Sequence, residues 1–154
     1  MENIPLEFNL SHSGDYAICA ISDDEVGCDI EKIKDVNLKI AKRFFSEEEY
    51  NNVLKDNKLF FRYWTLKESY LKAKGIGIKG LDNAKIDIES LTLINDDKYH
   101  LYELNIIDGY NIALCLSNNE NYEYKIITSV IIYSINTLES KLYFNYTSEN
   151  KTGK

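Results

Sequence analysis

Short apolar runs broken by polar turns dominate the first and last parts of the chain. Residues 16–21 and 26–30 are apolar and are separated by the polar stretch 22–25, which predicts a β-hairpin. Four further runs are rich in β-branched and aromatic residues and predict strands, at residues 85–94, 99–107, 110–116 and 124–135. Turn-forming residues separate these runs, at 95–97, 108–109 and 117–119.

The middle of the chain follows a helical period instead. Residues 37–45 carry apolar side chains at helical spacing. Ser46 with Glu49 three residues later forms a capping box, which predicts a second helix to about Leu54. The clearest helix runs from about Leu59 to Lys74 and ends before a glycine. Strands and helices are mixed without strict β-α-β alternation. The pattern therefore predicts an α+β fold in which an antiparallel sheet packs against the long helix.

Length and composition indicate one soluble domain. The 154 residues are 44% hydrophobic, so we expect a single domain over residues 1–145 and a polar tail that frays over 146–154. The start of the sequence carries no secretory signal pattern, and the apolar run 126–135 is too short to span a bilayer. Three cysteines in apolar runs, without C-x-x-C spacing, predict reduced and buried thiols. Together these features predict a cytoplasmic protein.

The net charge of −7 narrows the choice of partners. An acidic surface repels nucleic acid and anionic membranes, so neither is an expected partner. A phosphate-bearing ligand would need a local basic cluster or a metal site.

Two acidic residues flank Ile30 at the end of a predicted strand. Asp29 and Glu31 are two residues apart, so both carboxylates lie on one face of the strand, while Cys28 and Ile30 point to the core. Two carboxylates at one place suit Mg²⁺. By this spacing alone, an ordinary exposed acidic strand face is the more common explanation of the two carboxylates.

Two further groups of polar residues allow a functional and an ordinary interpretation. Trp64, Glu68 and Lys72 are spaced by four on the long helix, which fits a catalytic carboxylate beside a lysine or a surface ion pair beside a core tryptophan. Residues 11–14, Ser-His-Ser-Gly, read as a polar loop before the first strand. Such a loop could hold a phosphate or could be an ordinary turn.

The order and spacing of four segments resemble a known family. The segments are Asn-Leu-Ser-His-Ser-Gly at 9–14, Val-Gly-Cys-Asp-Ile-Glu at 26–31, Arg-Phe-Phe-Ser at 43–46 with Glu49, and Trp-Thr-Leu-Lys-Glu-Ser at 64–69 with Lys72 and Gly75. This combination resembles the 4′-phosphopantetheinyl transferases of the surfactin-synthetase type. The resemblance implies transfer of 4′-phosphopantetheine from coenzyme A to a serine of an acyl or peptidyl carrier protein, with Mg²⁺ or Mn²⁺, releasing adenosine 3′,5′-bisphosphate.

The resemblance also implies roles for individual residues. Asp29, Glu31 and Glu68 would bind the metal, and Glu68 and Lys72 would act on the incoming serine. Lys72, His12 and Ser11 would contact the phosphates of coenzyme A. Glu49 is either an acid near the metal or only the capping-box residue, and both alternatives stay open. Trp64 would lie in the core and Lys67 would form an ion pair or lie beside a phosphate.

The resemblance is to one half of these two-half enzymes. The four segments belong mostly to the C-terminal half, and the N-terminal half has no counterpart in this sequence. We therefore expect a homo-oligomer or a partner that supplies the N-terminal half. The alternative is a catalytically silent half that binds Mg²⁺ and coenzyme A and needs a partner chain. Residues 75–78, which follow the long helix, would lie near the carrier protein.

Overall fold

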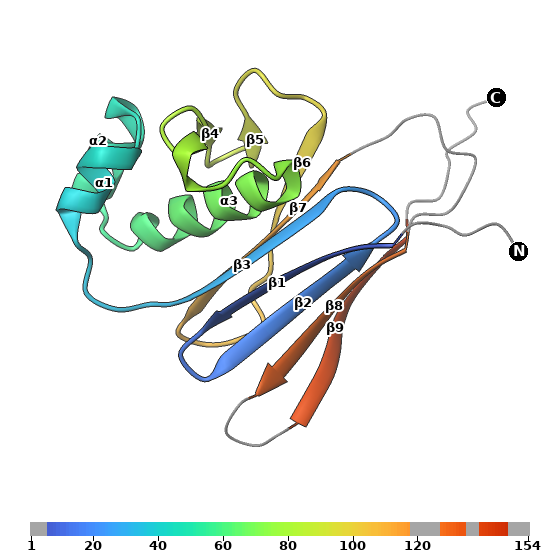
Figure 1. The fold of residues 1–154 in the computed structure, drawn as a ribbon. Helices are drawn as coiled ribbons and strands as arrows, with labels where there is room; N and C mark the ends of the chain where they lie inside the picture. Colours follow the sequence, from blue (N-terminus) through green and yellow to red (C-terminus); the bar gives the residue numbers. More distant parts are fainter. Residues whose placement is uncertain (1–5, 118–126, 135–138, 148–154) are drawn as a thin grey trace, which may run out of the picture.

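The fold is an α+β arrangement of three helices and antiparallel sheets (Figure 1). The computed structural model describes residues 6–117, 127–134 and 139–147, the last two ranges as backbone only. The helices are α1 (Leu38–Phe44), α2 (Glu47–Lys55), α3 (Leu59–Lys74) and the short 3₁₀ helix η1 (Ile78–Gly80). The strands are β1 (Glu7–Ser13), β2 (Tyr16–Ser22), β3 (Val26–Lys32), β4 (Ile86–Asp87), β5 (Thr92–Leu93), β6 (Tyr99–Glu103), β7 (Tyr110–Ser117), β8 (Ile127–Ser134) and β9 (Glu139–Thr147).

The strands form two main sheets and a small hairpin. The first sheet has the order β1-β2-β8-β9, the second β3-β7-β6, and β4 pairs only with β5. Helices gather on the side of β3 and β7, and the β1-β2-β8-β9 sheet lies on the other side (Figure 1). The antiparallel sheet packed against the long helix is confirmed, because α3 lies against β3 and β7.

The expected hairpin of residues 16–21 and 26–30 is wrong. These residues form β2 and β3, which belong to different sheets, and the polar stretch between them carries the chain from one sheet to the other. The hairpin partner of β2 is β1, joined to it by the two-residue turn Gly14-Asp15. Residues 11–13, expected in a loop, are the end of β1. Polar and apolar side chains alternate along β1 as in other strands, but here the polar side chains face the protein and the apolar side chains face outward.

The other elements follow the expectations with shorter or longer bounds. The region 85–94 contains only the two short strands β4 and β5, and β6 ends at Glu103 rather than residue 107. β9 was not expected, and it extends through Thr147 into the stretch expected to fray. Residues 118–126 and 148–154, where a turn, the start of a strand and most of the tail were expected, lie outside the described residues.

Local capping fixes the helix boundaries. Asn37 caps α1 by accepting a hydrogen bond from the Lys39 backbone N–H. Both bonds of the predicted capping box are present, since the Ser46 hydroxyl accepts from Glu49 N and Glu49 Oε2 accepts from Ser46 N. α3 ends at Gly75, whose φ of 69° is left-handed and favours glycine.

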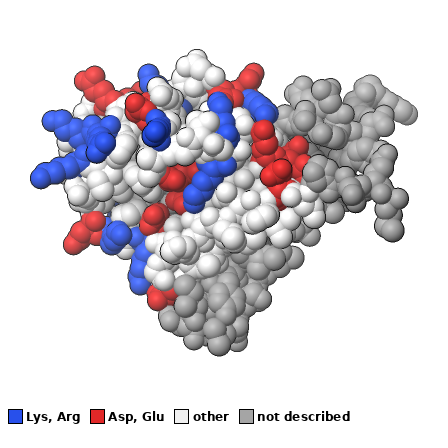
Figure 2. Space-filling view, in the orientation of Figure 1, with Lys and Arg blue, Asp and Glu red and all other residues white. Residues whose placement is uncertain are grey.

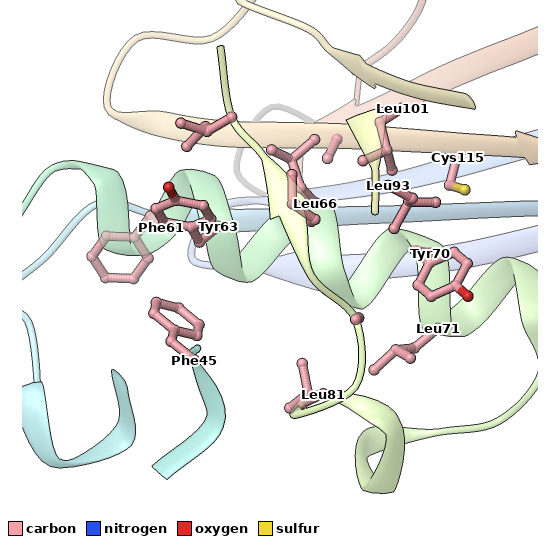
Figure 3. Close-up of a cluster of buried hydrophobic side chains, with 14 of the residues drawn as sticks. Phe45, Phe61, Tyr63, Leu66, Tyr70, Leu71, Leu81, Leu93, Leu101 and Cys115 are labelled. Atoms are coloured by element: carbon pink, nitrogen blue, oxygen red, sulfur yellow. The ribbon is translucent and has the colours of Figure 1, made fainter. Parts of the chain in front are cut away.

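Two apolar clusters form the core. The larger surrounds α3, which is buried on most sides because β-strands cover one face and α1, α2 and residues 78–93 cover the other. Figure 3 shows side chains of α3 such as Leu66 and Tyr70 among Leu81, Leu93 and Leu101. The smaller cluster lies between β2, β3 and β7 and includes Cys28 and Ile30, as expected.

Two further expectations concern the burial of the cysteines and the crossing of a membrane. The three cysteines are free; Cys28 and Cys115 are buried, but Cys19 is partly exposed, so its expected burial is wrong. None of the helices in the described part of the chain is long and apolar enough to cross a membrane.

Helix α3 makes an unusually close approach to β3 at Gly27. A Cβ atom there would lie 1.9 Å from the Ser69 carbonyl oxygen and 2.4 Å from the Ala73 backbone nitrogen. Only glycine allows this contact without a shift of backbone. The contact brings the last two turns of α3 beside the carboxylates of β3.

Candidate active site

The outer edge of β3 is bonded by side chains of β1 instead of by a neighbouring strand. The backbone N–H of Cys28 donates to Asn9 Oδ1 at 3.0 Å. Two further N–H groups at this edge of β3, those of Ile30 and Lys32, donate to the hydroxyls of Ser11 and Ser13 at 3.4 and 3.1 Å. The three β1 side chains alternate along the strand, which is why they reach three alternate N–H groups of β3.

The same serines hold the two acidic residues of β3. Ser11 Oγ donates to Asp29 Oδ1 at 2.8 Å, and Ser13 Oγ donates to Glu31 Oε2 at 2.9 Å. The carboxylates therefore share one face of β3, as their spacing predicts. Asp29 is only 4% exposed, so the interpretation as an ordinary exposed acidic face is wrong for this residue.

Lys72 on α3 neutralises Asp29. Its ammonium lies 2.7 Å from Asp29 Oδ1 and donates to the Cys28 carbonyl at 3.0 Å. The ordinary alternative, a surface pair of Glu68 with Lys72, is therefore not what forms. The reason is the contact at Gly27, which puts Lys72 next to β3 and gives it a buried carboxylate 43 residues away in the chain.

Glu68 lies in the electric field of both β3 acids. Burial raises the pKa of Glu68 above its usual range, and the nearby carboxylates of Asp29 and Glu31 raise it further, against the opposing effect of Lys72. Burial likewise raises the pKa of Asp29, although Lys72 and Ser11 favour its charged form. One lysine therefore faces three acids, and the site has spare negative charge.

Two oxygens at this place have no hydrogen-bond partner among the residues that the structure describes. Asp29 Oδ2 and Glu68 Oε1 are buried and unpaired. Buried polar atoms are rarely left unsatisfied, and a cation would satisfy both. Hard oxygen donors suit Mg²⁺, which takes one or two carboxylates and completes its shell with water and phosphate oxygens. The residues present therefore fit a divalent cation.

Glu31, the third expected metal ligand, is held differently from Asp29 and Glu68. Within the described residues, no three acidic, histidine or cysteine side chains are arranged so that they alone could bind a metal ion. Glu31 bonds to Ser13. The structure thus brings Asp29, Glu68 and Lys72 together and places Glu31 beside them.

His12 points away from these groups. It alternates with Ser11 and Ser13 along β1, so it lies on the opposite, exposed face of the strand. That face also carries Phe8 and Leu10, and we call these three residues, with the adjacent Leu6, the outer face of β1. The expected grouping of Ser11 with His12 is therefore split between two faces.

Glu49 and Lys67 form a buried ion pair within the scaffold. Lys67 Nζ lies 2.8 Å from Glu49 Oε2 and also donates to the carbonyls of Leu81 and Ala84. Glu49 accepts from the backbone N–H of Ser46 and of Ile86. Together these contacts join α2 and its N-cap, α3 and residues 81–86, so the geometry favours the capping role over a place near the metal.

Trp64 is partly buried at the other end of α3. Its ring is stacked on Phe60 with centroids 5.9 Å apart, and it packs against the larger core cluster. This agrees with the expected structural role.

The sequence predicts no role for Asn9 or Gly27, and it places Ser13 only in a loop that could hold a phosphate. The signal for Asn9 and Ser13 was present as polar residues alternating with Phe8, Leu10 and His12, which is a strand pattern. Gly27 stands beside the acids in the sequence, but its contact with α3 depends on how the two elements pack.

The surface around the site has no single sign of charge. Figure 2 shows acidic and basic side chains intermixed on the face seen in Figure 1. On this face, an anionic ligand would therefore be held by local basic groups and not by an extended basic patch.

Comparison with known proteins supports one family. Residues 25–126 match the model of the 4′-phosphopantetheinyl transferase superfamily. The 4′-phosphopantetheinyl transferase Sfp of Bacillus subtilis is 35% identical over 129 residues, which cover 72% of this chain and 55% of the relative. The enzyme named gsp from Aneurinibacillus migulanus is 36% identical over 121 residues, covering 71% of this chain and 51% of the relative. The chain thus spans about half the length of these relatives. It belongs to the 4′-phosphopantetheinyl transferase superfamily.

Proposed function

We propose that this chain carries the catalytic site of a 4′-phosphopantetheinyl transferase, using coenzyme A and Mg²⁺ to modify a serine of an acyl or peptidyl carrier protein. The observation that carries the proposal is the pair of unpaired, buried oxygens of Asp29 and Glu68 beside Lys72. Relatives of this chain are named 4′-phosphopantetheinyl transferases, which supports the same reaction.

Asp29 and Glu68 would hold the metal, with Glu31 as a third ligand or as a ligand through water. The bound Mg²⁺ would neutralise the charge that develops on the diphosphate of coenzyme A as its phosphoanhydride bond breaks. Mn²⁺ prefers similar oxygen ligands and would serve in its place.

Lys72 would bind the same diphosphate from the protein side. Its side chain is 27% exposed, so the ammonium can reach a phosphate oxygen while it stays close to Asp29. This positive charge favours the transition state, in which the leaving phosphate gains negative charge.

Glu68 is a better candidate than Lys72 to accept the proton of the carrier serine, because the Lys72 ammonium is already paired with Asp29. The Glu68 carboxylate lies beside Asp29 and Lys72, where the metal and the diphosphate would bind, and a general base must be within hydrogen-bond reach of the proton that it removes. The serine oxygen would form a bond to the phosphorus of the phosphopantetheine group, and adenosine 3′,5′-bisphosphate would leave.

Contacts of Ser11 and His12 with coenzyme A stay predictions. Ser11 already donates to Asp29, so in this proposal it acts mainly through that carboxylate. His12 is available on the outer face of β1 for a phosphate of a ligand that reaches around the strand.

The outer face of β1 also supports an expected protein partner. Leu6 and Phe8 are each 67% exposed and Leu10 is 60% exposed. Contiguous exposed apolar side chains are typical of a protein interface. We propose that a second copy of this chain, or a separate chain with the other half of the enzyme, covers this face beside His12.

A transfer assay tests the proposed reaction. The chain, coenzyme A, Mg²⁺ and an apo carrier protein should give a carrier with the added phosphopantetheine mass. Asp29→Asn and Glu68→Gln should each lower the rate at least ~100-fold, because each removes a metal ligand. Glu89→Gln is a matched control, since Glu89 is an exposed acid on a turn outside the site.

The same assay distinguishes the proposed transferase from the alternative function, a catalytically silent half that needs a partner chain. The chain covers 55% and 51% of the two relatives, and under this alternative a separate chain would supply the remainder. Ligand binding without mass gain, with activity restored by a second chain, would support it. Absence of both mass gain and metal-dependent ligand binding would contradict both functions.

A further inference from the structure

We propose that Ser13 is a positioning residue that orients Glu31 toward the metal, and that Ser11 does the same for Asp29. This inference rests on the proposed metal site. It assigns a role to the alternating hydroxyls of β1, which lie beside the carboxylates of β3.

A backbone N–H of β3 determines where the Ser13 hydroxyl directs its proton. The hydroxyl accepts from the Lys32 N–H at 3.1 Å and donates to Glu31 Oε2 at 2.9 Å. A hydroxyl has one proton, so the bond accepted from Lys32 leaves that proton for the carboxylate. Holding one carboxylate oxygen in this way fixes the orientation of the other.

Ser11, two residues before Ser13 on β1, makes the same pair of bonds. It accepts from Ile30 N and donates to Asp29 Oδ1. Asn9 accepts from the backbone N–H and the thiol of Cys28, and within the described part of the chain it makes no bond to a carboxylate. The three residues therefore bond the same edge of β3, but only the two serines touch acids.

The turn after Ser13 is anchored to the second sheet. The Asp15 N–H donates to Tyr110 Oη at 3.0 Å, and the Asp15 carboxylate pairs with Lys32 at 3.1 Å. Gly14 has a φ of 55°, and a Cβ there would lie 2.5 Å from Tyr110 Oη. These contacts hold the end of β1 against β3 and so keep Ser13 in reach of Glu31.

Some residues hydrogen-bond to a metal ligand without contacting the metal. Removing such a residue typically lowers metal affinity about 10–100-fold. We therefore expect Ser13→Ala to weaken Mn²⁺ binding by about tenfold or more. Ser13→Thr keeps the hydroxyl and should restore it. Asn9→Ala removes a bond to the same edge without touching an acid, so it should lower thermal stability but leave Mn²⁺ affinity within about threefold of wild type.

The measurement is a titration of the chain with Mn²⁺ in the presence of coenzyme A, followed by the electron paramagnetic resonance signal of free Mn²⁺. Thermal unfolding of each variant is measured on the same samples. If Ser13→Ala does not fold, Ser13→Cys replaces it, because a thiol has similar size but donates weakly.

The outcomes are distinct. Weak binding by the Ala or Cys variant, with rescue by Thr, supports the inference. Equal Mn²⁺ affinity in wild type and Ser13→Ala, or equal losses in Ser13→Ala and Asn9→Ala, overturns it and leaves the proposed metal site intact. No Mn²⁺ binding by the wild-type chain overturns both the metal site and the positioning role.

Discussion

At the residue scale, the site is a small excess of buried negative charge. Asp29 and Glu68 each keep a buried oxygen without a hydrogen bond, while Lys72 neutralises only one carboxylate. Such an arrangement costs stability when all the acids are charged and gains it when a cation binds. The cost to the stability of the free protein and the proposed affinity for a metal ion therefore have one electrostatic cause.

This charge excess predicts a pH dependence of stability. Because the pKa of Glu68 is raised in the fold, the folded chain holds the proton more tightly than the unfolded chain does. Stability from this group is present below the ordinary carboxyl pKa and is lost as pH rises through the folded pKa. Without metal, Glu68→Gln should therefore melt higher than wild type at neutral pH, by about 2–4 °C for each 1 kcal/mol relieved.

Thermal unfolding from pH 4 to 8 in a chelating buffer measures this difference. The gap between Glu68→Gln and wild type should widen as pH rises, and Mg²⁺ with coenzyme A should close or reverse it. A gap that stays constant with pH would contradict the electrostatic explanation.

The buried pair of Lys67 and Glu49 gives a second prediction. Lys67 is fully buried and its ammonium bonds to Glu49 and to two backbone carbonyls. Lys67→Met leaves the Glu49 charge buried without its cation, so it should cost about 3–5 kcal/mol of folding free energy. Denaturant unfolding measures this cost, and a loss below about 1 kcal/mol, the value of an exposed pair, would show that the pair is not buried in solution.

At the scale of elements, the site depends on the contact between β3 and α3. β3 carries Asp29 and Glu31, and α3 carries Glu68 and Lys72, so the relative position of the two decides whether the groups meet. Gly27 sets that position because any side chain there would overlap the backbone of α3. The 3₁₀ segment after α3 is fixed separately by the carbonyls bonded to Lys67.

Gly27→Ala tests this contact. The added methyl group should displace α3 and destabilise the chain by about 1–3 kcal/mol or more, with loss of metal binding in the fraction that stays folded. Gly109→Ala is not a clean control because its φ is 78°. Ala73→Gly serves instead, because a glycine within α3 destabilises the helix by about 1 kcal/mol without adding an atom at the Gly27 contact. Unchanged Mn²⁺ affinity in folded Gly27→Ala would refute the role of this contact.

At the scale of the whole molecule, the chain is acidic, and β1 presents an apolar outer face. A net charge of −7 favours solubility, yet the outer face of β1 exposes Leu6, Phe8 and Leu10 side by side. The proposed explanation is a second chain on this face. Its presence would also cover His12 and form the other wall of a binding site.

We expect the chain to self-associate through this face. Phe8→Ser removes the largest apolar side chain there, and it should shift a dimer toward monomer by at least ~10-fold in dissociation constant, because about 2 kcal/mol of apolar burial is lost. Light scattering over a range of protein concentrations measures the shift. Ile94→Ser is the matched control, since Ile94 is also exposed but lies on the β4–β5 side. A wild-type chain that stays monomeric at every concentration would contradict self-association.

The sequence by itself determined the features that arise from neighbouring residues. The capping box at Ser46 and Glu49, the end of α3 at Gly75 and the shared face of Asp29 and Glu31 all follow from bonds or periodicities within a few residues. The four-segment resemblance also pointed to the family that the comparisons identify.

Only the tertiary structure decided which distant groups meet. Ser11 and Ser13 reach acids 18 residues away, and Lys72 reaches an acid 43 residues away. These pairings depend on β2 and β3 lying in different sheets and on α3 touching Gly27. Local propensity carries no information on sheet order or helix position, because both are set by packing across the core.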